Sequence, residues 1–292
     1  MIFDRQDTFP LPFQPRTTMR RVIAGLALAT AATLVTVAPA QAAPANPVKT
    51  LKQQFKPGHG VRVSETARSY VDGKAAETLR TTGKLAFGKK GVIAADLTSR
   101  AKSSGKGNTR TSLSALGSNR TISTGDHRYL QGGIFTDMLP EGKKWLRYPG
   151  FSHQSNQMVD IFNPKVLKGL VAKAENVKGD YKGTVTLKQL AAFQDTKIPG
   201  KLGKIKVKYL LDTNARGLVT RVVSEWTLDF GLMGSSRTVT DTRYTGWGSK
   251  VTIKAPAKSQ WLDIADLFAE TPDADIPSEI PEDAISSLGV GG

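Results

Sequence analysis

The residue types that most often do chemistry are sparse in this sequence of 292 residues, and they are not grouped. The chain has no cysteine, which excludes thiol catalysis, cysteine metal sites and disulfides. Its three histidines, His59, His127 and His153, lie far apart, and none has a second histidine at helical spacing. We therefore expect each of them to be a surface or turn residue and not a metal ligand.

The motifs of common enzymes are also missing. No Gly-x-Ser-x-Gly segment occurs, and the glycines of residues 231–235 have the wrong spacing for one, so we expect a hairpin loop there. Residues 105–107, Gly-Lys-Gly, lack the spacing of a phosphate-binding loop and the Ser or Thr that follows its lysine. The sequence predicts no catalytic residues, no metal and no cofactor. A hydrolase whose polar groups meet only in the folded chain stays an alternative.

The first 42 residues are typical of an export signal. Two arginines precede an apolar run over residues 22–37, and small residues surround a cleavage site after about Ala42. The run is about 16 residues long, which is short for a membrane span of roughly 20. The segment before Met19 contains Asp4, Asp7 and three prolines, which is unlike a positive leader region and favours Met19 over Met1 as the translation start. We expect a secreted protein with no lipid anchor, because the cysteine that carries such an anchor is missing.

The positive charge is concentrated in the body of the chain. Residues 43–262 contain 37 of the 41 Lys and Arg residues but only 15 of the 25 Asp and Glu residues. Such a surface attracts anionic partners, which makes an anionic membrane or a cell-wall surface a candidate partner, and solubility alone is the alternative explanation of the charge. Nucleic acid is not, because no basic helix or aromatic ladder accompanies the lysines. The acidic end, residues 271–292, has too few large apolar residues to fold and is expected to be disordered.

A period of two in the apolar residues dominates residues 59–270. Apolar residues alternate with lysines from residue 204, residues 214–217 form a turn sequence, and the chain returns over residues 218–230. This pattern predicts a long antiparallel hairpin over residues 204–230. Further strands are expected at residues 61–71, 77–87, 92–101, 109–116, 120–123, 128–131, 144–148, 181–185, 237–244 and 250–254.

Helical patterns are few. Asn163 and Pro164 are typical of a helix start, with Asn as the N-cap and Pro in the first turn. Thr186 is expected to cap a second short helix and Ser259 a third, whose apolar residues are Trp261, Ile264, Ala265 and Phe268. We find no repeat and no interior linker. The expected organisation is an extension plus signal peptide (1–42), a flexible lead-in (43–58), one strand-rich α+β domain (59–270) and a disordered acidic tail (271–292).

The order of these segments resembles the LolA-like fold, and in particular the actinobacterial LppX/LprG type of lipid-carrying lipoprotein. The likeness covers roughly residues 60–270. It is carried by the paired strands at 78–97, the strand at 142–148, the capped helix at 163–173, the strand and helix at 181–190, the hairpin at 204–230, and the segments Thr-Gly-Trp-Gly at 245–248 and Val-Thr-Ile-Lys-Ala-Pro at 251–256. The departure from the family pattern is the missing lipidation cysteine.

The resemblance implies a curved antiparallel half-barrel with helices in its concave face and an apolar space between them for acyl chains. The matching candidate lining residues lie on the first helix and on the hairpin: Val166, Leu167, Leu170, Val171, Ile205, Val207, Tyr209, Leu211, Val222 and Trp226. The expected function is that of a monomeric, non-enzymatic carrier of a lipid or other hydrophobic molecule. Two readings stay open beside it. Each of these residues can be ordinary core, and the protein can be an envelope interaction or signalling module with a filled interior that binds a protein or an anionic polymer.

Overall fold

The computed structural model describes residues 45–103, 117–133, 138–153, 156–177, 179–198 and 200–269, all within one compact unit of residues 42–292. The segments expected to be a signal peptide, a disordered acidic tail and a strand at residues 109–116 lie outside the described residues. The elements are α1 (Pro47–Gln54), β1 (His59–Val71), β2 (Lys74–Phe87), β3 (Val92–Ser103), β4 (Ser118–Thr124), β5 (His127–Gly132), β6 (Trp145–Pro149), α2 (Pro164–Lys173), β7 (Glu175–Val177), β8 (Asp180–Thr186), α3 (Leu187–Phe193), η4 (Leu202–Lys204), β9 (Lys206–Thr213), β10 (Val219–Asp229), η5 (Gly231–Met233), β11 (Ser235–Lys250), η6 (Lys258–Gln260), β12 (Trp261–Asp263) and α4 (Ile264–Ala269).

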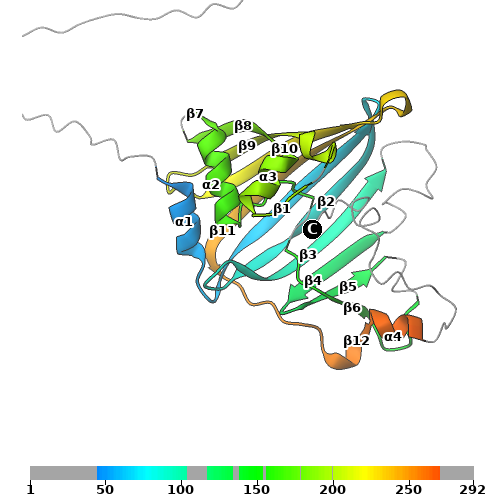
Figure 1. Ribbon diagram of the computed structural model, residues 1–292. Coiled ribbons are helices and arrows are strands. Elements are labelled where there is room, and N and C mark those ends of the chain that lie inside the picture. The colour runs from blue at the N-terminus through cyan, green and yellow to red at the C-terminus, as the bar shows by residue number, and fades with distance from the viewer. Residues whose placement is uncertain are drawn as a thin grey trace, which may run out of the picture. The chain divides into compact units, whose positions relative to one another are not determined.

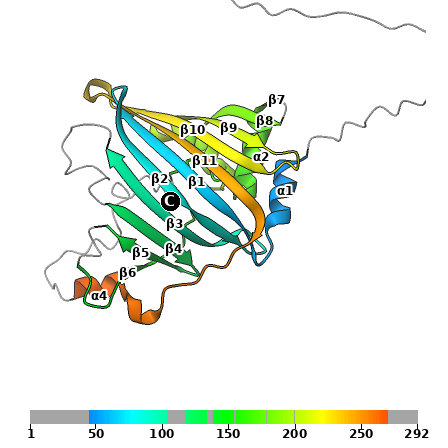
Figure 2. The same ribbon diagram turned by 180° about the vertical axis from the view of Figure 1, so that it is seen from behind.

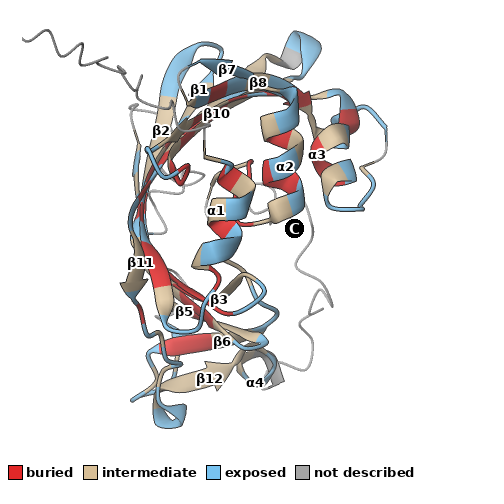
Figure 3. Ribbon diagram, turned by 90° about the vertical axis from the view of Figure 1, so that its left-hand side faces the viewer, coloured by how far each residue is buried: buried red, intermediate tan, exposed pale blue. Residues whose placement is uncertain are grey.

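The described strands form one open, curved sheet (Figures 1 and 2). Its order is β12-β6-β5-β4-β3-β2-β1-β11-β10-β9-β8-β7, and every neighbouring pair is antiparallel except β12 with β6. Helices α1, α2 and α3 lie on the concave side (Figure 3). The expected strand-rich half-barrel with helices in its concave face is therefore confirmed, and so is the hairpin, as β9 and β10.

Alternation along each strand decides which side chains face the helices. In β1, Val61, Val63 and Ala67 are buried on the concave face, whereas Arg62 and Arg68 are exposed on the convex face. Residues directly opposite one another in an antiparallel pair share a face, so the register extends this division across the sheet. The concave face is mostly apolar, with a few buried polar residues in its central strands, and the convex face is mostly polar.

Gly83 in β2 permits a close approach within the sheet. A Cβ atom at this position would lie 2.0 Å from the carbonyl oxygen of Asp96 in β3 and 2.9 Å from the side chain of Leu97. Gly83 also lies opposite Val63 of β1, at the centre of the curved region. Glycine in a strand interior typically marks such a bend or close backbone contact. Any larger residue would push β2 and β3 apart.

The predicted helix starts are confirmed at α2 and α3. The Asn163 side chain accepts hydrogen bonds from the backbone N–H groups of Lys165 and Val166, and Pro164 is the first helical residue. At α3, Thr186 and Gln189 cap each other's backbone N–H groups reciprocally, which is a complete capping box. Each cap satisfies donors that a helix leaves unpaired at its N-terminus.

The flexible lead-in expected at residues 43–58 is wrong for residues 47–54, which form α1. Asn46 caps this helix as Asn163 caps α2, and Pro47 follows it in the first turn. Leu51 is only 3% exposed and Phe55 8%, and both belong to the main core cluster. The segment is ordered because its apolar face covers part of the concave side of the sheet.

Two expectations near the C-terminus are also wrong. Lys250 ends β11, and residues 251–257 form no strand. Instead Val251 and Ile253 pack on the convex face, against Ala86 and Ala94. The third helix begins at Ile264 and not near Ser259, because residues 261–263 pair with β6 as β12. No helix among the described residues is long and apolar enough to cross a membrane.

Replacing Leu51 by Ala tests whether α1 is part of the folded core. We expect a loss of about 2–5 kcal/mol in the free energy of unfolding, since a buried leucine would leave a cavity under the helix. Gln53→Ala, on the exposed side of the same helix, should change stability by less than about 0.5 kcal/mol. Urea denaturation monitored by circular dichroism measures both, and equal stability of the two variants would contradict the assignment.

Candidate functional site

The candidate site is the apolar interior between the concave face and its cover of helices. Nine of the ten residues predicted to line it come together in the main core cluster. Seven of these are buried: Val166, Leu167, Leu170, Val207, Tyr209, Leu211 and Val222. Val171 and Trp226 are half-buried and pack against the same cluster. The tenth, Ile205, precedes β9 and ends η4, and it lies outside the cluster.

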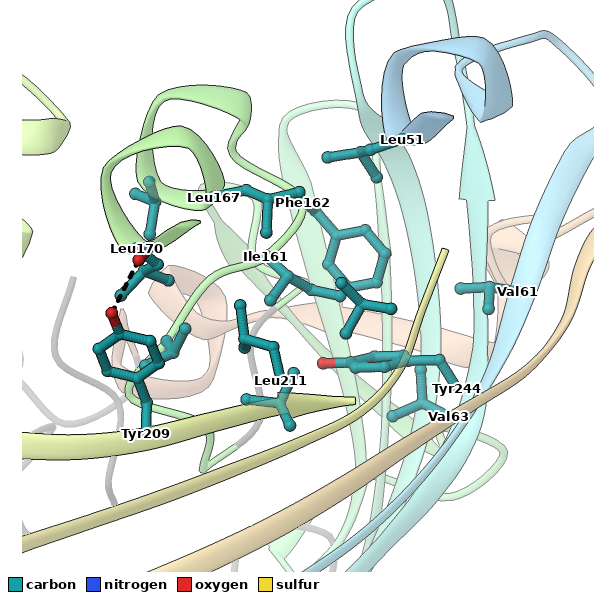
Figure 4. Close-up of a cluster of buried hydrophobic side chains, with 14 of the residues drawn as sticks. Leu51, Val61, Val63, Ile161, Phe162, Leu167, Leu170, Tyr209, Leu211 and Tyr244 are labelled. Atoms are coloured by element: carbon teal, nitrogen blue, oxygen red, sulfur yellow. Dashed lines mark hydrogen bonds between the residues drawn. The ribbon is translucent and has the colours of Figure 1, made fainter. Parts of the chain in front are cut away.

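Helix α2 and the β9–β10 hairpin face each other as expected, but they are in direct contact. Leu167, Leu170 and Leu211 are all 0% exposed, and the Tyr209 hydroxyl donates a hydrogen bond of 2.7 Å to the carbonyl oxygen of Leu170 (Figure 4). The expected gap between helix and hairpin is absent from this part of the structure. Side chains fill the space.

The Tyr209 hydrogen bond is also a cap on α2. Leu170 is among the last four residues of this helix, whose carbonyl groups have no partner within the helix itself. Burial raises the pKa of Tyr209 to about 12, so its hydroxyl keeps the proton that it donates at neutral pH. This contact therefore fixes the end of α2 to β9.

A short strap, residues 156–162, crosses the concave face and fills much of the interior. Val159 and Ile161 are each 1% exposed, and the Phe162 ring packs edge-on to Tyr244, with centroids 5.3 Å apart. Phe55, Phe87 and Trp247 complete an aromatic cluster around Phe162, with centroid separations of 5.6–6.1 Å. The strap thus occupies the centre of the half-barrel (Figure 4).

One carboxylate is buried in this apolar interior. Glu65, 2% exposed, accepts hydrogen bonds from the backbone and side-chain nitrogens of Asn156, at 2.8 and 3.1 Å, and from Thr242 Oγ1 at 2.8 Å. Thr240 donates to the carbonyl oxygen of Asn156 at 3.1 Å, and Gln157 donates to Thr242 Oγ1 at 3.0 Å. These bonds tie the strap to the β1–β11 seam and compensate the burial of the charged group.

A small cavity remains beside the strap. Its volume is about 20 Å³, which suits a single water molecule and not an acyl chain. The lining combines apolar residues with three polar side chains, and it comprises Val63, Leu85, Leu97, His153, Gln157, Val159, Asp160, Ile161, Phe162 and Tyr244. Burial, and then the charges of Glu65 and Asp160, raise the pKa of Tyr244 well above 10, so this phenol is neutral.

The histidines were expected to be surface or turn residues, but all three are half-buried. His153 Nε2 lies 3.4 Å from a carboxylate oxygen of Asp160, and the imidazole packs edge-on to Phe162. The residues lining the cavity beside this pair include no Ser, Thr, Cys or Lys to serve as a nucleophile. Among the described residues, no group of three or more His, Cys, Asp or Glu side chains could hold a metal ion.

Sequence reasoning missed α1, the strap and Glu65 as parts of this interior. Two of them had a readable signal. Asn46-Pro47 repeats the Asn-Pro start used at α2, with Val48, Leu51 and Phe55 at helical spacing. Glu65 occupies an inward position in the alternation of β1, after Val61 and Val63. The strap offers no such signal, because its partners lie on distant strands.

Comparisons with known proteins give similarity to solved structures alone, because no protein-family model and no curated protein matches the sequence. The Mycobacterium tuberculosis lipoprotein LppX is 14% identical with a TM-score of 0.36, over 71% of this chain and 96% of that chain. A LolA superfamily protein from Nitrosomonas europaea is 9% identical with a TM-score of 0.30, over 70% and 92% of the two chains. A DUF1329 family protein from Desulfovibrio piger is 13% identical with a TM-score of 0.28, over 72% and 95%.

Tyr209→Phe tests the bond between α2 and the sheet. The variant leaves the Leu170 carbonyl buried without its donor, so we expect a loss of about 1–3 kcal/mol in unfolding free energy. Tyr148→Phe is the matched control. The Tyr148 hydroxyl has no hydrogen-bond partner among the described residues, so removing it should leave the unfolding free energy nearly unchanged. Denaturant titrations at pH 7 compare the two. A Tyr209→Phe protein as stable as the wild type would show that this bond contributes nothing.

Proposed function

We propose that the protein is a secreted, non-enzymatic carrier that takes up a lipid or another hydrophobic molecule between the concave face of the sheet and its helices. The observation that carries this proposal is the apolar interior, which has a β-sheet wall on one side and a wall of helices and strap on the other. The ligand space is not preformed, because the two walls are in contact. Uptake therefore requires α2 and the strap to move outward.

The way the two walls are joined supports such a movement. Backbone hydrogen bonds connect each strand to its neighbours, but α2 is held to the sheet chiefly by apolar side chains and by the Tyr209 hydroxyl. Separating apolar surfaces costs free energy in proportion to the area exposed, and a hydrocarbon chain inserted between them restores that burial. Each methylene sheltered from water contributes about 0.8 kcal/mol, so about 12 of them give roughly 10 kcal/mol before association costs.

Uptake of a fluorescent phospholipid by residues 42–292 tests the carrier. We expect saturable binding of one lipid per protein, and Trp226→Ala should weaken it about tenfold or more, because this half-buried side chain packs at the rim of the proposed space. Trp261→Ala removes the same side chain from the opposite, convex face and should leave binding unchanged. Native mass spectrometry of protein from its own secreting host provides the second measurement. Bare polypeptide there, together with no lipid uptake, would end the proposal.

A second candidate function is an interaction module that keeps its filled interior and binds an anionic polymer on its convex face. The close packing of the interior favours it, and so does one feature of the sheet. Arg80 and Arg100 are exposed and lie directly opposite one another on β2 and β3. Neither forms an ion pair within the described part of the chain. Like charges in this position destabilise a strand pair, and a bound anion would offset the repulsion.

Arg80→Gln with Arg100→Gln separates this candidate from the carrier. If the convex face is the binding surface, the double variant should lose retention on an anionic polysaccharide column at low salt and gain slight stability from the removed repulsion. Lipid uptake should not change. Unaltered retention would eliminate this convex site, whatever the outcome of the lipid measurements.

A further inference from the structure

We propose that one end of the sheet, where β1 and β10 end in turns, docks on an anionic phospholipid bilayer, with Phe230 and Leu232 entering the headgroup region. This inference concerns a surface outside the apolar interior and does not depend on the proposed ligand. We call the surface the tip edge. It comprises the turn after β1 (residues 72–73) and the loop after β10 (residues 230–234), with the strand ends that adjoin them. The turn after β1 and the loop after β10 lie side by side in both ribbon views (Figures 1 and 2).

Large apolar side chains gather at the tip edge without cover from the described residues. Leu232 is 108% exposed relative to a reference residue, Phe230 49% and Val71 53%. Isolated exposed apolar residues are common, but several on adjacent turns indicate an interaction site.

These side chains project from an ordered loop. Phe230 N donates to the carbonyl oxygen of Gly234 at 2.9 Å, and the Asp229 carboxylate accepts from Gly231 N at 2.8 Å. Gly234 has a φ of 96°, and a Cβ atom there would lie 2.4 Å from a carboxylate oxygen of Asp72, so only glycine fits. The loop therefore presents Phe230 and Leu232 in a fixed geometry although the sheet does not need them for its core.

The two turns of the tip edge are tied together. Asp72 N donates to the carbonyl oxygen of Ser235 at 3.0 Å, and the Asp72 carboxylate accepts from Ser235 N at 2.7 Å. Val71 and Phe230 are thus held on one rigid support formed by β1, β2, β10 and β11. A preorganised apolar tip loses little conformational entropy when it binds.

The charges around the tip edge identify the partner. Lys74 and Arg237 are exposed there, and Arg237 lies over the Tyr70 ring at 4.6 Å from its centroid. The acids of the two turns, Asp72 and Asp229, accept hydrogen bonds from backbone N–H groups of the loop after β10. Neither cation forms an ion pair with another described residue, and protruding apolar side chains beside such cations match the boundary between acyl chains and anionic headgroups. A protein partner would not require exposed apolar side chains and cations side by side.

Co-sedimentation of residues 42–292 with vesicles tests the proposal. We expect binding to vesicles of phosphatidylglycerol and phosphatidylcholine (1:1) and at least tenfold weaker binding to phosphatidylcholine alone. Phe230→Ser with Leu232→Ser should reduce binding to the mixed vesicles at least tenfold, because the apolar insertion is lost. Ile93→Ser removes an apolar side chain about as exposed as Phe230, 53% against 49%, at the opposite end of the strands and should bind like the wild type.

A second readout reports where the tip lies in the bilayer. A Leu232→Trp variant should gain a blue-shifted emission on the mixed vesicles that lipids brominated near the headgroup quench, and Ile93→Trp should not. Equal binding by the serine variants, abolished by salt, would mean adsorption through the basic body and would overturn the proposal. Failure of the wild type to bind vesicles would also overturn it and would leave the tip edge to a protein partner. Circular dichroism verifies that each variant is folded.

Discussion

The structure depends on covering the concave face of one open, curved sheet. Strands β1, β2, β3, β9 and β10 present apolar side chains there, and an open sheet cannot bury its own face as a closed barrel can. Helices α1, α2 and α3 and the strap cover this face. Each of them begins with a side-chain cap or another hydrogen bond of a polar side chain. The Asn-Pro caps stabilise the starts of α1 and α2, and the Tyr209 bond and the Glu65 network join the cover to the sheet, while apolar burial provides most of the stabilisation.

The buried polar network has a role that apolar packing cannot fill. Aromatic and aliphatic side chains can pack in several arrangements of similar volume. The Glu65 carboxylate is more demanding, because its donors must lie within hydrogen-bond distance. Asn156 and Thr242 meet this requirement in one register of the strap against β1 and β11. The network therefore selects which residues of the strap point into the interior.

Local patterns in the sequence predicted the elements, whereas long-range contacts determined the site. The hairpin, α2 and α3 followed from alternation and capping residues, and they place nine candidate residues in one cluster. The alternation of Val251 and Ile253 predicted a strand that does not form, because an extended segment packed on a sheet face has the same pattern as a paired strand. Whether the interior keeps a space for a ligand also depends on the volumes of Phe55, Phe162 and Trp247, which reach it from distant segments and have no common sequence signal.

The β1–β11 seam has a consequence for how the chain is made. Glu65 and Thr242 meet across it although they are 177 positions apart. During synthesis β1 is made early, and its partner β11 is made only after nearly all the other strands. Until then β1 is a long unpaired edge with an apolar face, which other nascent chains can join. Pairing at such a long sequence separation slows assembly, and a circular permutant that places β11 directly before β1 would shorten that exposed interval.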